Sequence, residues 1–259
     1  MNNTPINQSI AKAFALLEHF TEEHPEWGVR ELAKELGANP STTFRIMSTL
    51  ESLGVLRQDA VTERYSLSLK LFELGHRVPL QKALVSRTHP VLATVAEEIT
   101  ETVHLGILRD AQVFMIDKVE SKNGLKLNSQ IGTYSPIHCS GLGKILLAHQ
   151  AENQQAELLA GAALKPYTPH TLTNPDQIIN ELAKVKSQGF ALDREEKELG
   201  LICLAVPVFN TKGDLIAALS AAGPANRFRE AALPDYVDTL QRGAKRMQER
   251  IGSFDLAIF

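Results

Sequence analysis

Two cysteines and several histidines are the side chains of this sequence best suited to covalent or metal chemistry. Cys203 together with His104 or His138 supplies the residue types of a thiol nucleophile and its base. A reactive cysteine needs partial exposure and a neighbour that stabilises the thiolate, whereas Cys203 lies within an apolar run. We therefore predict no catalytic residue and no enzyme activity. A cysteine-dependent hydrolase of a small acid, with an N-terminal interaction module, is the alternative.

The same side chains are weak candidates for a metal site. Metal-binding residue types occur at His104, His138, Cys139, Asp193 and Cys203. Adjacent positions such as 138 and 139 rarely bind one ion, and the sequence lacks the CxxC and HxxxH spacings of zinc sites. We predict no metal and no cofactor, and leave open an adventitious zinc ion in a ligand pocket.

A glycine-rich segment at 140–144, SGLGK, has some features of a phosphate-binding loop. It lacks a glycine five residues before Gly143, and Ile145 stands where a serine or threonine would bind magnesium. A helix starting at about Gly141 would still direct backbone N–H groups and the positive end of its dipole at a carboxylate or phosphate. Close packing of that helix on a sheet explains the glycines equally well.

The stretch 189–208 predicts the wall of a pocket. An acidic half begins at Asp193, and an apolar half from Leu201 to Phe209 has the composition of a buried strand. On that strand Cys203 and Ala205 belong to the face with smaller side chains, which leaves room for a ligand or a close-packed helix. A solvated loop that precedes a core strand is the alternative. The opposite face of the strand consists of Ile202, Leu204, Val206 and Val208.

This stretch resembles the C-terminal signature of the IclR family of transcriptional regulators, GxAxDxEExxxGxxCxAxPV, at every fixed position. The resemblance implies an α+β domain similar to GAF-type sensor domains, which binds a small carboxylate effector. It implies that the effector-binding residues are Gly141, Leu142, Asp193, Cys203 and Ser220. A second serine of the family pattern is Ala222 here, so we expect one polar contact to the effector to be lost. The runs LDREEKELGLICLAVPVF and YSLSLKLFELG most resemble regulators of sugar-acid catabolism.

The N-terminal part has the pattern of a winged helix-turn-helix. Helices are predicted over 8–21, 29–36 and 40–53, followed by strands at 55–58 and 64–69 that form a wing. Asn39-Pro40 is typical of a helix start, and Gly54 marks the end of that helix. The inner face of the third helix is predicted to carry Thr43, Ile46, Met47, Leu50 and Leu53.

The outer face of the third helix suits the major groove of DNA, because hydroxyls and an arginine can contact phosphates and base edges. The run ELAKELGANPSTTFRIMSTLESLGVL resembles the IclR helix-turn-helix, and Ser41, Thr42 and Arg45 fall on its typical recognition positions. Phe44 departs from the polar aromatic often found there. A helical unit that only packs is the alternative. The predicted DNA-binding residues are Ser41, Thr42, Phe44, Arg45, Ser48 and Arg64.

Composition limits the remaining classes of function. The chain has 259 residues, a net charge of −3 and two cysteines. No run approaches the roughly 18–20 apolar residues of a membrane helix, and the N-terminus has no secretory signal. We therefore expect a cytoplasmic protein without a membrane partner. The net charge argues against binding of nucleic acid by bulk charge, although a local basic surface is compatible with it.

The second part of the sequence is expected to form a two-layer α+β domain with an antiparallel sheet. Strands are predicted at 102–108, 112–119, 126–130, 201–209 and 215–222, and helices at 85–99, from about 141, at 176–188 and at 231–251. The predicted organisation is a DNA-binding domain over 6–68, a linker helix over 69–84 and an effector-binding domain over 85–252.

These features predict a ligand-responsive DNA-binding regulator, a repressor that senses a small organic acid such as a sugar acid or keto acid. Its expected partner is a palindromic operator in double-stranded DNA, bound by a homodimer or homotetramer. A protein-interaction scaffold that binds neither DNA nor ligand is a third interpretation.

Overall fold

In the computed structural model, helices of the N-terminal part begin at side chains that accept hydrogen bonds from free backbone N–H groups, and the third helix is followed by a glycine that turns the chain away. Asn7 Oδ1 accepts a hydrogen bond from the N–H of Ser9, and Asn39 Oδ1 accepts one from Ser41, so the predicted start of the third helix is confirmed. Gly54 follows this helix with φ +73°, a left-handed conformation that glycine adopts without strain. The four helices are α1 (Gln8–Leu17), α2 (Val29–Glu35), α3 (Pro40–Ser52) and α4 (Leu69–His76).

A small antiparallel sheet completes the N-terminal part and forms the wing. Its order is β1 (Glu26–Trp27), β3 (Tyr65–Leu67) and β2 (Leu56–Gln58). The strands β2 and β3 were predicted, whereas β1 is too short to leave a periodic signal. The core between helices and sheet includes Leu16, Leu32, Met47, Leu56 and Tyr65.

Some large apolar side chains of this part are exposed, among them Leu53, which was predicted on the inner face of the third helix. Leu53 is 63% exposed, and Ile10 and Phe14 of α1 are 57% and 65% exposed. The helix α1 ends at Leu17 rather than at Thr21. Leu53 is the C-cap of α3, where the chain already leaves the helix, so it does not share the buried face.

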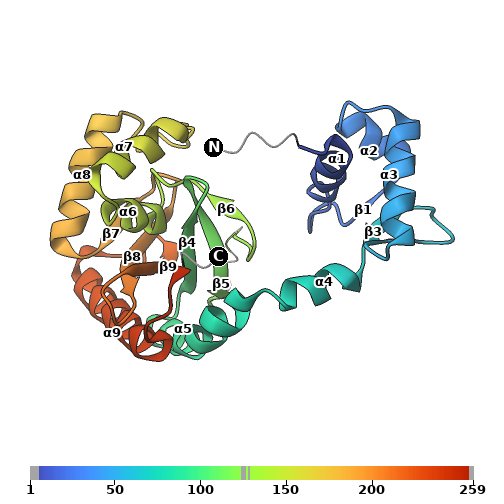
Figure 1. Cartoon of the computed structure of the whole chain (residues 1–259). Helices are drawn as coiled ribbons and strands as arrows, with labels where there is room; N and C mark the ends of the chain where they lie inside the picture. The colour runs from blue at the N-terminus through green and yellow to red at the C-terminus, as the bar shows by residue number, and fades with distance from the viewer. Residues whose placement is uncertain (1–5, 124–126, 128, 257–259) are drawn as a thin grey trace. The chain divides into compact units, whose positions relative to one another are not determined.

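The contacts within the chain divide it into two units, Met1–Pro79 and Leu80–Phe259 (Figure 1). The structure describes residues 6–123, 127 and 129–256. None of the helices in this described part combines the length and apolarity that a bilayer crossing needs. The second unit opens with a π-helical turn, Gln81–Val85, that leads into α5 (Ser86–Ile99).

A six-stranded antiparallel sheet organises the second unit, in the order β6-β5-β4-β9-β8-β7. The strands β4, β5, β8 and β9 confirm the expected antiparallel α+β fold. The strands are β4 (Thr102–Arg109), β5 (Gln112–Val119), β6 (Tyr134–Ser135), β7 (Ala191–Arg194), β8 (Leu201–Phe209) and β9 (Leu215–Pro224). The helices after α5 are α6 (Gly141–Ala148), α7 (Glu152–Gly161), α8 (Pro175–Gln188) and α9 (Leu233–Ile251), the last preceded by the turn Glu230–Ala232.

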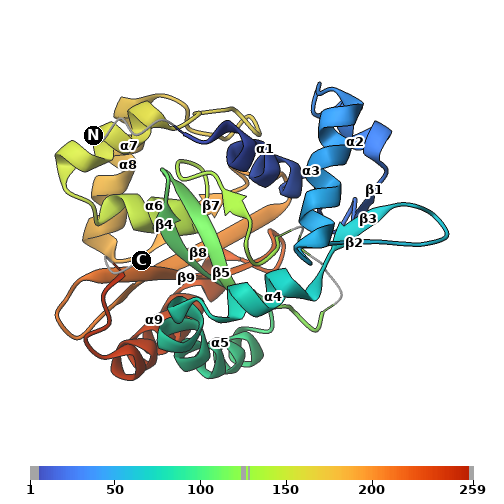
Figure 2. The same ribbon diagram turned by 45° about the vertical axis from the view of Figure 1, so that its right-hand side comes forward.

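Helices cover both faces of this sheet, so the predicted two-layer arrangement is wrong. The helices α5 and α9 pack on one face, and α6, backed by α8, packs on the other (Figures 1 and 2). A strand that is buried on both faces has apolar residues at every position, and β8 has that composition. The sequence signal for a second helical layer was therefore present in β8 itself.

The alternation predicted for β8 decides which helix packs where. Leu204 and Val206 face the large core beneath α5 and α9, whereas Ala205 faces the core beneath α6. Small groups on the α6 side let this helix approach closely. A Cβ added at Gly141 would lie 3.3 Å from Ala205 Cβ, and one at Gly143 would collide with the carbonyl group of Ile137. The glycines of 140–144 therefore serve close packing.

Three local predictions need correction. The strand expected at 126–130 lies partly outside the described residues, and the described Leu127, Ser129 and Gln130 are not in a strand. The strand beside β5 on the side away from β4 is β6, only two residues long. The helix α7 was not predicted. The acidic segment expected as a loop contains the strand β7, with Asp193 inside it.

Candidate functional site

A small cavity lies between the sheet of the second unit and the N-terminal end of α6. Its volume is about 60 Å³, several times the roughly 10–15 Å³ that one water molecule needs. Four of the five residues predicted to bind the effector line it: Leu142, Asp193, Cys203 and Ser220. Gly141 is not among its lining residues. It packs beneath the cavity, where an added Cβ would lie 3.0 Å from the carbonyl oxygen of Cys203 and 3.1 Å from its sulfur.

Asp193 is a buried residue of β7, only 3% exposed, and not part of a solvated loop. Its Oδ1 accepts hydrogen bonds from the backbone N–H groups of Glu196, at 2.8 Å, and Lys197, at 3.4 Å. Burial raises the pKa of the Asp193 carboxyl to about 7, although the two backbone hydrogen bonds and the charge of Lys144 oppose the increase. The carboxyl therefore both fixes the turn after β7 and stays partly protonated near neutral pH.

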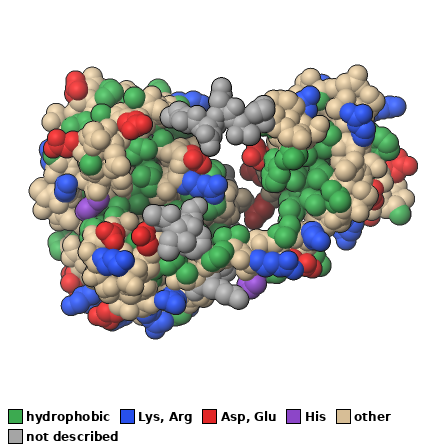
Figure 3. All heavy atoms as spheres, viewed as in Figure 1, with side chains coloured by type: hydrophobic (Ala, Val, Ile, Leu, Met, Phe, Trp, Pro, Cys, Tyr) green, Lys and Arg blue, Asp and Glu red, His purple; other side chains and the backbone are tan. Residues whose placement is uncertain are grey.

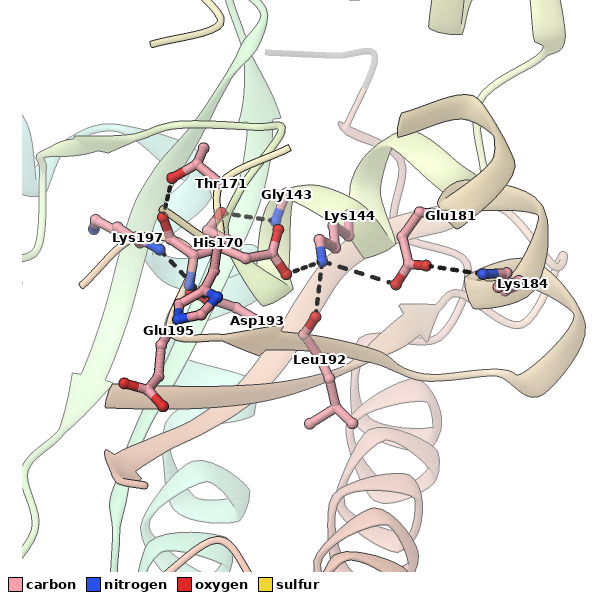
Figure 4. Close-up of polar contacts among 12 residues, drawn as sticks. Gly143, Lys144, His170, Thr171, Glu181, Lys184, Leu192, Asp193, Glu195 and Lys197 are labelled. Carbon is pink, nitrogen blue, oxygen red and sulfur yellow. Dashed lines mark hydrogen bonds and ion pairs between the residues drawn. The ribbon is translucent and has the colours of Figure 1, made fainter. Parts of the chain in front are cut away.

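A buried ion pair holds this turn from the side opposite the cavity. Lys144 reaches from α6 to the carboxylate of Glu196 and donates to the backbone oxygen of Leu192 at 2.9 Å (Figure 4). Glu181 of α8 contributes a second carboxylate 3.9 Å from the same ammonium. Burial raises the pKa of Glu196, and the charge of Lys144 counteracts it. The position of Asp193 is thus tied to α6 through its neighbours in the chain.

The thiol of Cys203 is not in a reactive environment. Burial raises its pKa to about 12, and the charge of Asp193 adds to the increase. The pKa of Cys139 is likewise raised to about 12 by burial. Burial lowers the pKa of His104 to about 3, so this imidazole is neutral at physiological pH. A thiol with so high a pKa has almost no thiolate at pH 7, which argues against Cys203 as the nucleophile of the hydrolase alternative.

Ser220 lines the cavity with a hydroxyl group that has no strong hydrogen-bond partner among the described residues. It is fully buried in β9, and its Oγ has no hydrogen-bond partner among the described residues apart from the weak thiol of Cys203. A buried hydroxyl without a good partner costs free energy unless a ligand or water completes it. The site therefore contains an unused donor and acceptor.

Sequence reasoning missed other polar residues of the cavity. His104 Nε2 lies 2.8 Å from Ser129 Oγ, and Lys197 Nζ donates to Ser135 Oγ at 3.0 Å. Ser140, the N-cap of α6, accepts from the N–H of Gly143. Lys197 belongs to the signature stretch and could have been noted there as the basic residue beside the cavity, whereas Ser129 and Ser135 left no signal. Among the described residues, no three His, Cys, Asp or Glu side chains are placed to hold a metal ion together.

The predicted DNA-binding residues lie on the accessible side of α3 and on the wing. Ser41, Phe44 and Arg45 are exposed, and Thr42 and Ser48 are half-buried. Arg64 is engaged within its own unit: it donates to Glu31 Oε2 at 2.8 Å and to the backbone oxygen of Glu26 at 3.0 Å. These contacts compete with any phosphate that Arg64 would bind.

Comparisons with known proteins agree with this architecture. A family model described as the IclR helix-turn-helix domain matches residues 9–60, and one described as the bacterial transcriptional regulator IclR C-terminal matches residues 77–249. The chain is 35% identical over 247 residues to the HTH-type transcriptional regulator KdgR of Escherichia coli, covering 95% of this chain and 94% of that protein. It is 31% identical to the transcriptional repressor IclR of the same organism, covering 93% and 88%. The crystal structure of IclR from Thermotoga maritima superimposes with a TM-score of 0.76 at 30% identity, covering 94% of this chain and 98% of that chain.

Proposed function

Because the chain belongs to the IclR family of bacterial transcriptional regulators, we propose that it represses genes from a palindromic operator and senses a small organic acid in the cavity beside Asp193. Family membership makes it a DNA-binding regulator with a ligand-binding C-terminal domain. The effector class, the site residues and the oligomeric state are the parts that we infer. The resemblance to regulators of sugar-acid catabolism supports a sugar acid or keto acid.

The observation that carries the effector class is the chemistry of the cavity lining. Hydroxyl groups of Ser129, Ser135, Ser140 and Ser220 border it, and Lys197 adds a positive charge. Clustered hydroxyls suit a ligand that itself has several hydroxyl or keto oxygens, and an ammonium suits its carboxylate. A volume of about 60 Å³ restricts the ligand to a small molecule. Leu142 supplies an apolar contact, and Asp193 and Glu198 add carboxyl groups to the same lining.

The exposed side of α3 supports operator reading by this helix. Arg45 is exposed on α3, and no ion pair holds its guanidinium among the described residues. An arginine in this state can make two hydrogen bonds to a guanine edge in the major groove. Ser41 and Thr42, in the first turn of the helix, are within reach of the phosphates. Because Arg64 is already engaged by Glu31, we expect it to contribute less than Arg45.

An apolar surface on the N-terminal unit supports assembly of two copies. Its exposed side chains are Ile10 and Phe14 on α1, with Leu69 and Phe72 on α4. Figure 3 shows hydrophobic side chains gathered on this unit over α1 and continuing to α4. Exposed apolar patches of this kind mark contact surfaces between proteins. Two copies joined here would present two recognition helices to the two halves of a palindrome.

Effector binding changes the affinity for the operator, and the coupling free energy between the two binding sites has the size typical of allosteric proteins. A coupling free energy of about 1–3 kcal/mol changes DNA affinity roughly 5–150-fold. Asp193 lines the cavity and accepts from the N–H of Glu196, whose carboxylate pairs with Lys144 of α6, so a ligand that contacts Asp193 also acts on this ion pair. We assign no enzymatic role, consistent with the regulators to which the chain is similar.

Selection of DNA fragments from a random library with the full chain tests the proposal. The expected result is an inverted repeat, bound by the parent chain and released by at least one small hydroxy or keto acid in a mobility-shift assay. Recovery of no sequence would contradict the operator part. Recovery of an operator that no organic acid affects would contradict the effector part alone.

A further inference from the structure

We propose that the ammonium of Lys197 is the charged group that anchors the carboxylate of the effector. This inference rests on the proposed function, because it assigns one residue to the acid group of the ligand sensed in the cavity. It makes Lys197 the residue that separates acids from neutral compounds of the same shape. None of the family signature positions includes it, since 197 is a variable position of that pattern.

Among the described residues that line the cavity, Lys197 is the lysine, and its ammonium has N–H donors left to use. Its half-buried side chain lines the cavity, and its ammonium donates to one neutral partner, Ser135 Oγ, at 3.0 Å. Within the described part of the chain, no carboxylate oxygen lies within 4.0 Å of Lys197 Nζ. An ammonium has three N–H donors, so two remain for a ligand. A half-buried cation without a counter-ion is poised to bind an anion.

Two other lysines of the second unit, Lys118 and Lys144, are each paired with a carboxylate. Lys118 Nζ pairs with Glu120 at 3.0 Å and donates to the backbone oxygens of Ser129 and Leu127, at 2.7 and 3.3 Å. Lys144 pairs with the buried carboxylate of Glu196. In Figure 4 the side chains of Lys144 and Lys197 extend away from each other, so the ammonium of Lys197 points away from the Lys144–Glu196 ion pair.

The start of α6 offers little to a carboxylate. The N–H of Gly141 is directed at the sulfur of Cys203, against which this glycine packs. The N–H of Gly143 donates to Ser140 Oγ at 3.1 Å. Of the first three N–H groups of the helix, only that of Leu142 has no recorded partner among the described residues. One backbone donor cannot match an ammonium with two open donors and a full charge.

A second observation points to a ligand in the same cavity and fixes its orientation. Ser220 is fully buried and lines the cavity, and within the described part of the chain its hydroxyl has no hydrogen-bond partner besides the weak thiol of Cys203. A ligand hydroxyl or keto oxygen would complete this hydrogen bond. Asp193, next to Cys203 across the sheet, can accept from a hydroxyl or donate when protonated. The acid group therefore lies at Lys197 and Ser135, and the oxygen-bearing carbons lie toward Asp193 and Ser220.

The test compares acids with their neutral amides on the full chain. D-gluconate, D-galacturonate and 2-oxobutyrate, each with its primary amide, are titrated into the parent and into Lys197→Met by calorimetry. Lys197→Arg is the conservative variant, and Lys212→Met, at an exposed position of the β8–β9 turn, is the matched control. A charge-assisted contact predicts that Lys197→Met weakens binding of the acid by roughly 10–100-fold and leaves its amide unchanged. Lys197→Arg is expected to recover most of the preference for the acid.

Each outcome decides one point. If the parent binds an acid and Lys197→Met binds it equally well, the anchor is elsewhere and this inference is wrong, while the proposed acid sensing stands. If the parent binds none of the acids, or binds acid and amide alike, acid sensing itself fails. If Lys197→Met loses acid and amide together, the residue shapes the cavity and does not read charge, which also overturns the inference. Thermal unfolding of each variant shows whether the fold is retained.

Discussion

The raised pKa of Asp193 makes folding of the second unit dependent on pH in a direction that one substitution can test. The carboxyl is 3% exposed, and its pKa rises from 3.8 to about 7 in the folded chain. The folded state therefore binds the proton more tightly than the unfolded state does. The contribution of Asp193 to the free energy of unfolding is therefore most favourable below pH 4, and it falls as the pH rises toward 7. Glu196 adds to the increase, whereas Lys144 counteracts it.

The change to make is Asp193→Asn. Asparagine keeps an oxygen for the N–H groups of Glu196 and Lys197, and its amide replaces the protonated oxygen, so the variant imitates the neutral acid at every pH. At 1.4 kcal/mol per pKa unit, the shift costs the parent about 4 kcal/mol in total, of which about 2–3 kcal/mol is lost between pH 5 and pH 8. The variant should therefore gain about 2–3 kcal/mol over the parent between those two pH values.

Urea unfolding of both proteins at pH 5 and pH 8, followed by circular dichroism, measures this difference. Asp110→Asn is the control, because Asp110 is an exposed residue of the β4–β5 turn, and it should show no such pH-dependent gain. The reasoning is refuted if Asp193→Asn is less stable than the parent by the same amount at both pH values. That result would mean that the carboxylate is ionised in the folded protein and stabilised by its lysine neighbours.

Three further predictions concern other parts of the chain. Arg45→Ala should weaken operator binding by about 1–3 kcal/mol and relax preference at one operator position, whereas Lys70→Ala should have a much smaller effect, as measured by mobility shift. Gly141→Val should abolish effector binding and preserve operator binding, because the valine side chain would collide with the backbone and sulfur of Cys203. Calorimetry with the acids measures the first effect and mobility shift the second; an unchanged effector affinity would contradict the prediction. Lys144→Met should lower the free energy of unfolding by about 3–5 kcal/mol, since it leaves a buried carboxylate unpaired, and urea denaturation that shows less than about 1 kcal/mol would disprove a structural ion pair.

Much of the fold could be predicted from local patterns. The start of α3 at Asn39-Pro40 and the alternation of β8 are read directly from residue types, because capping and period-two burial depend on the residues nearby. The apolar composition of β8 also signalled burial on both faces, but not which helices cover each face. That choice follows from contacts between segments far apart in the sequence, such as α6 with α8.

The candidate site shows the same division. Asp193 was identified by the family signature, but its surroundings were misjudged, because a run of charged residues has the composition of a solvated loop. Within that run Asp193 and Glu196 are buried, and the burial of Glu196 depends on Lys144, which comes from a helix about 50 residues earlier and neutralises it. Ser135 could not be found by pattern, since it reaches the cavity through a strand of only two residues.

In the turn after β7, adjacent residues have different roles: position 196 holds the turn in place, and position 197 faces the cavity. Glu196 faces Lys144 and secures the turn to the helix, whereas Lys197 faces the cavity. A substitution at 197 therefore leaves the support of the turn intact, while one at 196 removes it. Such an arrangement lets a regulator acquire a new signal molecule in a single mutational step without first losing its fold. Descendants of a common ancestor that respond to different compounds should accordingly diverge at 197 and agree at 196.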